Sequence, residues 1–306
     1  MRVSLREVAR QVGVSAATVS KVMNNTARAY ISGARRDQIF AAARASRYRP
    51  NDDIAIVSPG GAGATAITAR FFAGFQAAAQ EHDIRLVTEQ TRVTGVPDCI
   101  ERWRVGGAVF FDAISAATLA ALKERGIPYV LANPAEDRPR DCVIVDDYAG
   151  VRDALELMEL RGLKRAALML PRITHASFPK RLKAYRDFCK ARRIKRACAH
   201  SHDFYAALDE LGGVLSTRSR LGVVTVGEWG LALEAHLRAC TGRDDHLVVP
   251  VAEWSSPWTH PRAHVRLPLR AVAKAALEMI RSKWESGNAH AASVTVRPEL
   301  IEESTT

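Results

Sequence analysis

The sequence predicts a small all-α helix-turn-helix headpiece followed by a larger α/β core domain of two lobes. Two short segments with apolar residues at helical spacing flank a glycine near the start of the chain, and strand and helix patterns alternate from residue 54 onward. The 306-residue chain is long enough for one or two substantial cores after such a headpiece. We therefore expect a headpiece over residues 1–51 and a core domain over residues 52–306.

The first helix is expected to begin near Leu5. Ser4 can cap its N-terminus while Glu7, three residues later, reaches back to the Ser4 amide, an arrangement called a capping box. Apolar residues then recur at helical spacing, namely Leu5, Val8, Ala9 and Val12. Gly13 supplies the backbone freedom that a helix C-terminus needs, so the helix should end there.

A second and a third helix complete the predicted headpiece. Ser15 is the expected N-cap of the second, whose buried stripe consists of Val19, Val22 and Met23. Its other face carries small, hydroxyl-bearing and basic residues, namely Ala16, Ala17, Thr18, Ser20 and Lys21. The third helix is capped at Ser32, runs over about 34–46, and presents Ile39, Phe40 and Ala43 to the core.

The core domain is predicted from alternating patterns. The expected strands cover residues 54–58, 84–88, 108–111, 129–132, 143–145, 166–169, 223–226 and 247–249. The expected helices cover residues 69–81, 116–125, 148–160, 180–191 and 228–238. Repeated βα units imply parallel sheets with helices on both faces, and the length indicates two such lobes. Ligands of these folds bind at the carboxyl ends of strands, here in the cleft between the lobes.

The positive charge of the chain is concentrated in the headpiece. Residues 1–51 contain ten basic and two acidic side chains, a net charge of +8 out of +11 for the whole chain. Such clustering supplies sequence-independent, salt-sensitive attraction to phosphate groups. A charged run is often only a solvated face, but its coincidence with a helix-turn-helix favours DNA as the partner. Small residues on the second helix would let its backbone approach base edges.

Residues 3–51 closely resemble the headpiece of the lac repressor and galactose repressor (LacI/GalR) family of transcriptional regulators. The matching residues are Val8-Ala9, Gly13-Val14-Ser15, Ala17-Thr18-Val19-Ser20, Asn24 and Tyr48-Arg49-Pro50-Asn51. The resemblance implies that Ala16, Ala17 and Lys21 touch bases, the alanines through apolar contact such as that with a thymine methyl group. The other residues that we assign to DNA binding are Ser4, Ser15, Thr18, Ser20, Asn24, Tyr30, Tyr48, Arg49 and Asn51.

The same resemblance extends into the core, where the family has a periplasmic-binding-protein-like fold. The supporting blocks are Phe71-Phe72-Ala73-Gly74, Arg125-Gly126-Ile127-Pro128, Val145-Asp146-Asp147, Arg181-Leu182-Lys183-Ala184-Tyr185 and residues 296–304. By position, Asp146 and Arg181 match the aspartate and arginine with which the family contacts its effector. Phe71 and Phe72 lie where apolar side chains cover that ligand.

Several residues depart from the family pattern around the pocket. Gly227-Glu228-Trp229 stands where the family has Asn-Asp, and Ala252-Glu253-Trp254 stands where it has Asp-Asp. Glu228 and Glu253 can replace these groups, with Trp229 or Trp254 stacking on a ring, but each tryptophan is alternatively a core residue. Arg181 could pair with an anionic ligand or be an exposed helix residue. Compact segments at 89–106 and 199–221 suggest trimmed helices and a shallow or vestigial pocket.

The junction between headpiece and core is unusually short. The family has a hinge helix that wedges leucines into the minor groove, whereas here Asn51 is followed only by Asp52 and Asp53 before the strand expected at Ile54. Three residues span at most ~10 Å, too little for a hinge helix. The two aspartates would also place negative charge beside the DNA-facing module. We therefore expect any allosteric coupling to act through direct packing of headpiece on core.

Other classes of protein are disfavoured. No apolar run approaches the ~20 residues of a membrane span, and no signal peptide precedes the headpiece. The five cysteines are scattered without a CxxC pair, as expected of reduced thiols in the cytoplasm. Gly60-Gly61-Ala62-Gly63 lacks the lysine of a phosphate-binding loop, and Pro261 separates the helically spaced His260 and His264. We expect no enzymatic activity, no cofactor and no metal.

The sequence thus predicts a DNA-binding transcriptional regulator, in particular a repressor, controlled by a small metabolite. The effector would be a sugar, a sugar acid or another organic acid. The resemblance implies a homodimer that places two headpieces on a palindromic operator. The alternative is a DNA-binding repressor whose sensor domain is vestigial and serves only for dimerisation.

Overall fold

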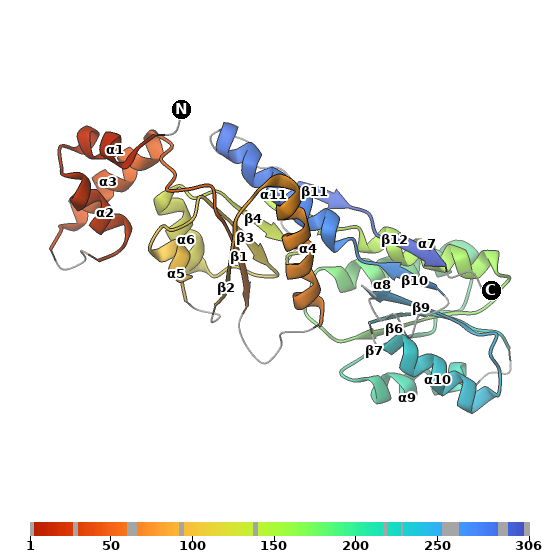
Figure 1. The fold of residues 1–306 in the computed structure, drawn as a ribbon. Coiled ribbons are helices and arrows are strands. Elements are labelled where there is room, and N and C mark those ends of the chain that lie inside the picture. The colour runs from red at the N-terminus through yellow and green to blue at the C-terminus, as the bar shows by residue number, and fades with distance from the viewer. Residues whose placement is uncertain are drawn as a thin grey trace. The chain divides into compact units, whose positions relative to one another are not determined.

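The computed structural model describes residues 3–26, 30–59, 66–91, 95–136, 140–216, 219–227, 229–252, 263–286 and 293–302. The chain forms two compact units (Figure 1). The first combines Met1–Ile144 with Arg270–Val294, and the second combines Val145–Leu269 with Thr295–Thr306. The predicted domain boundary at residue 51 lies inside the first unit, and it stays a prediction.

Three helices form the headpiece as the sequence predicts. They are α1 (Leu5–Val12), α2 (Ala16–Met23) and α3 (Gly33–Ala45). The side chains of Val8, Val19, Ile39 and Phe40 are fully buried in their common core, because the apolar stripe of each helix faces the other two. The expected N-caps at Ser4, Ser15 and Ser32 are all present.

The rest of the first unit is built on a six-stranded sheet in the order β11-β5-β4-β3-β1-β2. Strand β1 runs parallel to both β2 and β3, with Ile54 opposite Leu86 on one side and Gly107 on the other. The strands are β1 (Ile54–Pro59), β2 (Leu86–Thr91), β3 (Gly107–Phe111), β4 (Tyr129–Ala132), β5 (Cys142–Val145) and β11 (Ser293–Val296). The helices are α4 (Ala66–His82), α5 (Asp98–Glu101), α6 (Ala116–Arg125) and α11 (Leu269–Ser286).

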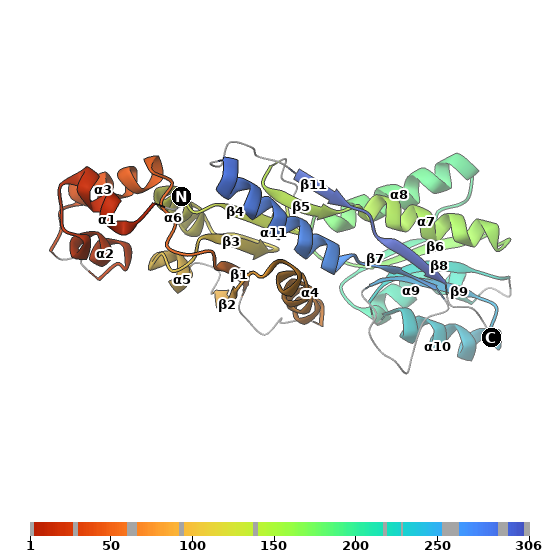
Figure 2. The ribbon, with the colours of Figure 1, turned by 45° about the horizontal axis from the view of Figure 1, so that its top comes forward.

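One face of this sheet shares its hydrophobic core with the headpiece. Val57 and Phe110 point from the strands towards Ile100 of α5 and Leu122 of α6, and this cluster continues into the core around Phe40 of α3. Figure 1 and Figure 2 both show α5 and α6 between the sheet and the three headpiece helices. The headpiece is therefore packed on the core rather than tethered beside it.

The second unit repeats the same plan. Its sheet has the order β12-β10-β9-β8-β6-β7, parallel except for the antiparallel pair β10 and β12. The strands are β6 (Ala166–Pro171), β7 (Cys198–Ser201), β8 (Gly222–Val226), β9 (Leu247–Ala252), β10 (Ala263–Arg266) and β12 (Glu299–Glu302). The helices are α7 (Asp147–Leu160), α8 (Ser177–Arg192), α9 (Phe204–Leu215) and α10 (Trp229–Thr241).

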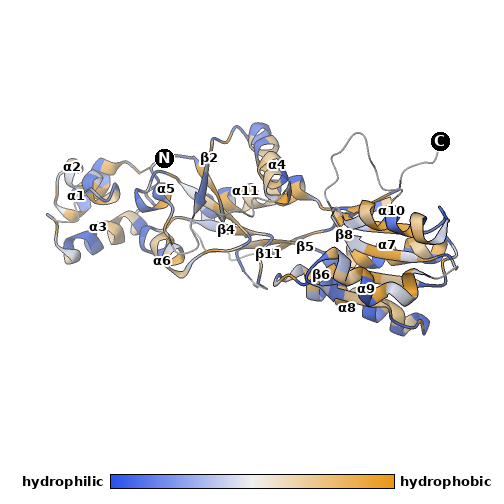
Figure 3. Cartoon of the chain, turned by 90° about the horizontal axis from the view of Figure 1, so that it is seen from below, coloured by the Kyte–Doolittle hydropathy of each residue, from blue (hydrophilic) through white to orange (hydrophobic). Residues whose placement is uncertain are grey.

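Helices cover both faces of this second sheet. Helices α7 and α8 pack together on one face and α9 and α10 on the other (Figure 1). Each of these helices carries both hydrophobic and hydrophilic residues in Figure 3, as expected of an amphipathic helix lying on a sheet. The predicted α/β architecture with parallel sheets is therefore confirmed.

Some elements were not predicted from the sequence. They include the 18-residue helix α11 and the strands β10 to β12 near the end of the chain. Helix α9 lies within the segment 199–221 that we expected to be trimmed, where Asp203 caps it and Leu208, Leu211 and Leu215 are buried. Among the described residues, no helix is long and apolar enough to cross a membrane.

Candidate nucleic-acid interface and effector site

The turn between α1 and α2 is held by local hydrogen bonds at both helix ends. The Ser4 amide donates to the Glu7 carboxylate at 2.6 Å, and the Glu7 amide donates to Ser4 Oγ at 3.3 Å, which confirms the capping box. The Ser4 amide and the Ser4 hydroxyl both donate to the Glu7 carboxylate, and these two hydrogen bonds lower its pKa. At the other end Gly13 has φ +68° and Val14 donates back to the Ala9 carbonyl at 3.1 Å.

Helix α2 presents a surface of small and polar side chains. Ser15 Oγ accepts from the Thr18 amide at 3.0 Å and lies 2.9 Å from Thr18 Oγ1, so the first turn is capped. Ala17 and Lys21 are exposed, whereas Ala16 packs partly against the headpiece core. The helix can therefore approach a groove with its N-terminal half and leave one ammonium group free to reach a base or phosphate.

Two further predicted DNA-binding groups flank this surface. Asn24 caps the C-terminus of α2, where its Nδ2 donates to the Ser20 carbonyl at 2.9 Å. The side chain of Tyr30 is 90% exposed, so it contributes almost nothing to the headpiece core. A tyrosine in this state has its hydroxyl available to a ligand outside the protein.

The other three predicted DNA-binding residues lie at the junction with the core. Tyr48 packs edge-on against Trp103, with their ring centroids 5.5 Å apart. The Arg49 guanidinium lies 4.2 Å from the Trp284 ring centroid. Asn51 Nδ2 donates to the Arg104 carbonyl at 2.7 Å. Apart from Ser4, the N-cap of α1, and Tyr30, which precedes α3, the predicted DNA-binding residues thus lie either on α2 and its caps or at this junction.

The linker has no helix, as the sequence predicts. Strand β1 begins at Ile54 directly after Asp53, and no residue between Ser46 and Asp53 is helical. A Cβ atom on Gly106 would overlap the Asn51 backbone oxygen, so the linker lies directly on the core. The indole Nε1 of Trp284 donates to the Gly106 carbonyl at 2.8 Å and fixes the same loop.

The two linker aspartates are paired with arginines. Arg49 binds Asp52 at 2.7 Å, and Arg85 Nε donates to Asp53 Oδ1 at 2.8 Å. The short linker brings both carboxylates within reach of guanidinium groups, which offset the negative charge expected beside the DNA-facing module. Asp53 is almost completely buried by its pairing.

Trp103 joins the headpiece to the core, a role that no sequence pattern indicated. Its ring is 96% buried and lies 6.0 Å from the Phe40 ring as well as beside Tyr48. Its φ of +42° is unusual for a bulky residue and costs free energy that the contact must offset. Around it, Asn25 Nδ2 donates to Glu101 Oε1 at 2.8 Å.

The predicted effector residues of the first unit lie on α4. Phe71 is fully buried and packs on Phe75 and Phe111, with ring centroids 4.6 and 4.2 Å away. Phe72 is only partly buried, so it has more surface available for a ligand than Phe71.

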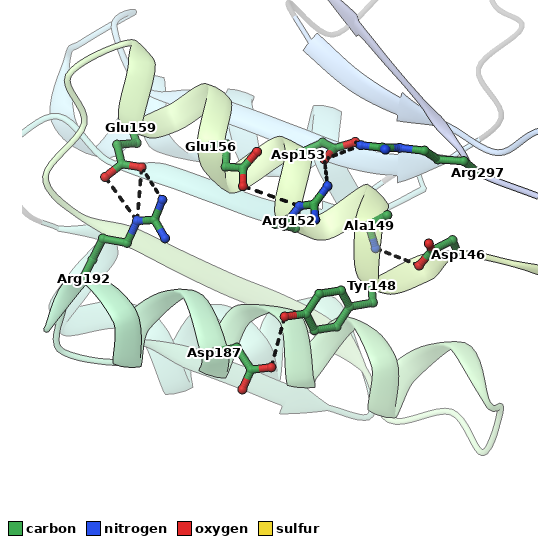
Figure 4. Close-up of polar contacts among 10 residues, drawn as sticks. All are labelled: Asp146, Tyr148, Ala149, Arg152, Asp153, Glu156, Glu159, Asp187, Arg192 and Arg297. Atoms are coloured by element: carbon green, nitrogen blue, oxygen red, sulfur yellow. Dashed lines mark hydrogen bonds and ion pairs between the residues drawn. The ribbon is translucent and has the colours of Figure 1, made fainter.

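The predicted effector residues of the second unit surround the start of α7. Asp146 is the N-cap of α7, and its Oδ1 accepts from the Ala149 amide at 2.9 Å (Figure 4). Arg181 on α8 is buried and binds Asp147 rather than Asp146, with Nη2 2.6 Å from Oδ1. Of the open alternatives for Arg181, exposure on a helix surface is therefore wrong. Asp147 supplies the neutralising charge that a buried guanidinium needs.

Ion pairs and a hydrogen bond fix α7 to its surroundings. Arg192 binds Glu159 at 2.8 Å, and the Tyr148 hydroxyl donates to Asp187 at 3.1 Å, so α7 is joined to α8 at two places (Figure 4). These contacts set the position of Asp146 at the helix N-terminus. The contacts between α7 and α8 thus hold Asp146 and Arg181, the predicted effector residues, on two helices that are packed together.

Trp229 stands at the start of α10 and packs edge-on against Phe204, with ring centroids 5.8 Å apart. This contact is one expected of a core residue. Glu228, Glu253 and Trp254 lie outside the described residues. All five cysteines are free thiols, and among the described residues no group of three or more His, Cys, Asp or Glu side chains could hold a metal ion.

Comparison with known proteins identifies the headpiece. Residues 4–51 match the model of the family described as bacterial regulatory proteins, lacI family. The chain is 29% identical over 191 residues to the HTH-type transcriptional regulator AglR of Rhizobium meliloti, a match that covers 55% of this chain and 52% of AglR. It is 49% identical over 49 residues to GalS of Salmonella typhimurium, covering 16% of this chain and 14% of GalS. The chain thus spans about half the length of AglR.

Solved structures extend the likeness to the whole fold. The lac repressor bound to ONPG has a TM-score of 0.65 and 19% identity, with all of both chains covered. A complex of the transcriptional regulator CelR with cellobiose has a TM-score of 0.63 and 20% identity, with 98% of each chain covered. Residues 4–51 thus carry the helix-turn-helix pattern of the lacI family of bacterial regulatory proteins, and the chain as a whole has the fold of the lac repressor.

Proposed function

We propose that the protein is a sequence-specific DNA-binding transcriptional regulator that represses its target genes in the cytoplasm. The observation that carries this proposal is the doubly capped helix-turn-helix, which leaves the polar surface of α2 exposed. The lacI-family match over the same residues and the regulator function named for AglR and GalS support it. The concentrated positive charge of the headpiece would provide the electrostatic part of the affinity.

The proposed DNA contacts divide by chemistry. Ala16 and Ala17 would meet apolar groups such as thymine methyls, and Lys21 would reach a base edge. Hydroxyl and amide groups would hold the phosphate backbone, namely those of Ser4, Ser15, Thr18, Ser20, Asn24 and Tyr30. The lac repressor is a dimer on its operator in a related structure, which supports a homodimer on a palindromic site here.

Residues 52–306 would form the effector-binding and dimerisation domain. A carbohydrate or an organic acid is the proposed effector, because related structures of this fold hold cellobiose and ribose. Phe72, Asp146 and Arg181 are the described residues best suited to it. One observation favours the alternative of a vestigial sensor: the Arg181 guanidinium is already satisfied by the buried carboxylate of Asp147.

The proposed coupling acts through the junction. The headpiece and the core share Trp103, so a ligand that moves the strands or helices of the first unit would move the headpiece as a body. A folding hinge is not needed for this mechanism. A ligand bound to the core would shift the headpiece only as far as it binds one arrangement of headpiece and core more tightly than another.

Selection from random double-stranded DNA, followed by binding measurements on the enriched sequence, tests the proposed function. We expect an inverted repeat and an affinity that falls steeply with salt. A thermal-shift screen with sugars, sugar acids and sugar phosphates tests the effector, since a ligand at 100 times its dissociation constant adds ~2.7 kcal/mol to stability. Failure to enrich any sequence would overturn the DNA-binding role, and the absence of any shift would favour the vestigial sensor.

A further inference from the structure

A cavity of about 460 Å³ lies at the junction of headpiece and core. It is bounded by the last turns of α3 and α6, by the linker and by the end of α11, all within the first unit. Its size is in the range of small-molecule binding sites. Tyr48 and Arg49, two of the predicted DNA-binding residues, line it, but no residue of the α2 surface and none of the predicted effector residues does.

The charged side chains around the cavity are unbalanced. Six are cationic, namely Arg44, Arg47, Arg49, Lys123, Arg125 and Lys283, and the one carboxylate is that of Asp141. Three of the cations are neutralised by ion pairs: Arg49 by Asp52, Arg125 by Glu124 and Lys283 by Asp141. Arg44 donates to the backbone carbonyl of Glu124, which carries no formal charge.

The side chains of the remaining two cations, Arg47 and Lys123, are exposed and form no hydrogen bond or ion pair with any other described residue. Arg47 comes from the headpiece and Lys123 from α6 of the core. An excess of three positive charges, Arg44 included, therefore faces one cavity from both sides of the junction. Cations so placed can grip one anion between them.

Stabilisation of helix ends does not account for this excess. Helices α3 and α6 both terminate at the cavity, and each C-terminus carries a partial charge of roughly −0.5. Together they offset about one of the three charges, which leaves about two. A second cavity of about 580 Å³, also lined by Trp103, has three arginines and three carboxylates, so the imbalance is not general to the junction.

The buried guanidinium of Arg125 is under-compensated in the same place. Burial lowers its pKa more than the neighbouring Glu124 carboxylate raises it. Its guanidinium also lies 5.2 Å from the Phe40 ring, which links the cavity wall to the headpiece core. A negative charge in the cavity would favour the charged form of this side chain.

We propose that the junction cavity binds a small phosphorylated molecule, held between Arg44 and Arg47 of the headpiece and Lys123 of the core. Each guanidinium group can donate two parallel hydrogen bonds to phosphate oxygens, and the lysine adds a point charge from the core side of the cavity. A ligand gripped from both sides would hold the headpiece on the core. This site is separate from the predicted effector residues, and its existence does not depend on DNA binding.

Calorimetric titration of the full chain with pyrophosphate, without DNA and at constant ionic strength in chloride, tests the proposal. We expect one site, and an affinity reduced about tenfold or more in Lys123→Ala and Arg47→Ala, the effect of losing one charge-assisted hydrogen bond. Lys195→Ala removes an equally exposed lysine from the second unit and should leave binding unchanged.

Two results would overturn the proposal. One is the absence of pyrophosphate binding. If pyrophosphate does not bind and Lys123→Ala weakens DNA binding, the cations contact the DNA backbone instead. The other is equal weakening by Lys123→Ala and Lys195→Ala, which would indicate diffuse charge rather than a site. Because the titration contains no DNA, loss of the proposed anion site would leave the proposed regulatory function in place.

Discussion

Replacing Trp103 with alanine should release the headpiece from the core. The indole is 96% buried and contacts both Phe40 and Tyr48 of the headpiece. Alanine retains the left-handed backbone conformation but loses the ring, so no strain is relieved in exchange. The change therefore removes the aromatic contacts without altering any charge at the junction.

The expected cost has two parts. Truncation of a buried aromatic residue to alanine destabilises by ~3–5 kcal/mol in total, cavity included. Each aromatic pair contributes ~0.5–1.5 kcal/mol beyond its buried area, so the two rings account for ~1–3 kcal/mol of docking. Docking weakened by that amount raises the population of the undocked headpiece roughly 5- to 150-fold.

Amide hydrogen exchange and limited proteolysis measure this population. In Trp103→Ala we expect faster exchange in α1 to α3 and cleavage in the linker around Asp52. Trp229→Ala is the control, because it removes a tryptophan that packs in the second unit. Asn25→Gly is a milder second variant that removes only the hydrogen bond to Glu101 and tolerates φ +55°.

The reasoning is refuted if Trp103→Ala lowers the free energy of unfolding but leaves headpiece exchange and linker cleavage unchanged. The indole would then stabilise the core alone. Should the variant fail to fold, Asn25→Gly decides the matter, since it must accelerate headpiece exchange more than it affects the rest of the chain.

Three further outcomes are expected. Gly13→Ala should destabilise the headpiece by ~1 kcal/mol in chemical denaturation. The added Cβ would meet no atom within 4 Å, so the cost comes only from holding alanine at a left-handed φ of +68°. Lys21→Ala should weaken operator binding by ~1–3 kcal/mol in fluorescence anisotropy while Lys195→Ala does not, and equal losses would contradict base contact by Lys21. Burial lowers the pKa of His246, whose Nδ1 accepts from the Leu221 amide, so stability present above its unfolded pKa of ~6.5 should fall as pH drops below that value. His246→Asn keeps an acceptor there and should flatten this pH dependence between pH 7.5 and 5, and an unchanged slope would show that other groups cause it.

Local signals predicted the elements that begin and end with strong caps. Helix α6 runs over the predicted residues 116–125 because Ser115 caps one end and Gly126, with φ +69°, ends the other. Helix α8 begins three residues before its prediction. Pro179 lies in this first turn, where a proline is tolerated because its missing N–H needs no partner.

Long-range packing decided what local patterns could not. Trp103 carries no local sign that it would lie against Phe40, because the contact joins segments 63 residues apart. For Arg181 the sequence left open a pairing with an anionic ligand or exposure on a helix, and it did not predict the ion pair with Asp147 that the packing of α7 on α8 produces. The absence of a hinge helix in the linker, in contrast, could be predicted from the sequence, because the number of residues alone limits the distance that a segment can span.

The ordered linker also has a thermodynamic consequence. A linker that folds only on DNA gives up ~1–2 kcal/mol of conformational freedom per residue on binding and buries fresh apolar surface, which makes the heat capacity change strongly negative. Here Tyr48, Asn51 and Asp53 already have their partners on the core. DNA association should therefore proceed with a small heat capacity change, and its enthalpy should vary little with temperature.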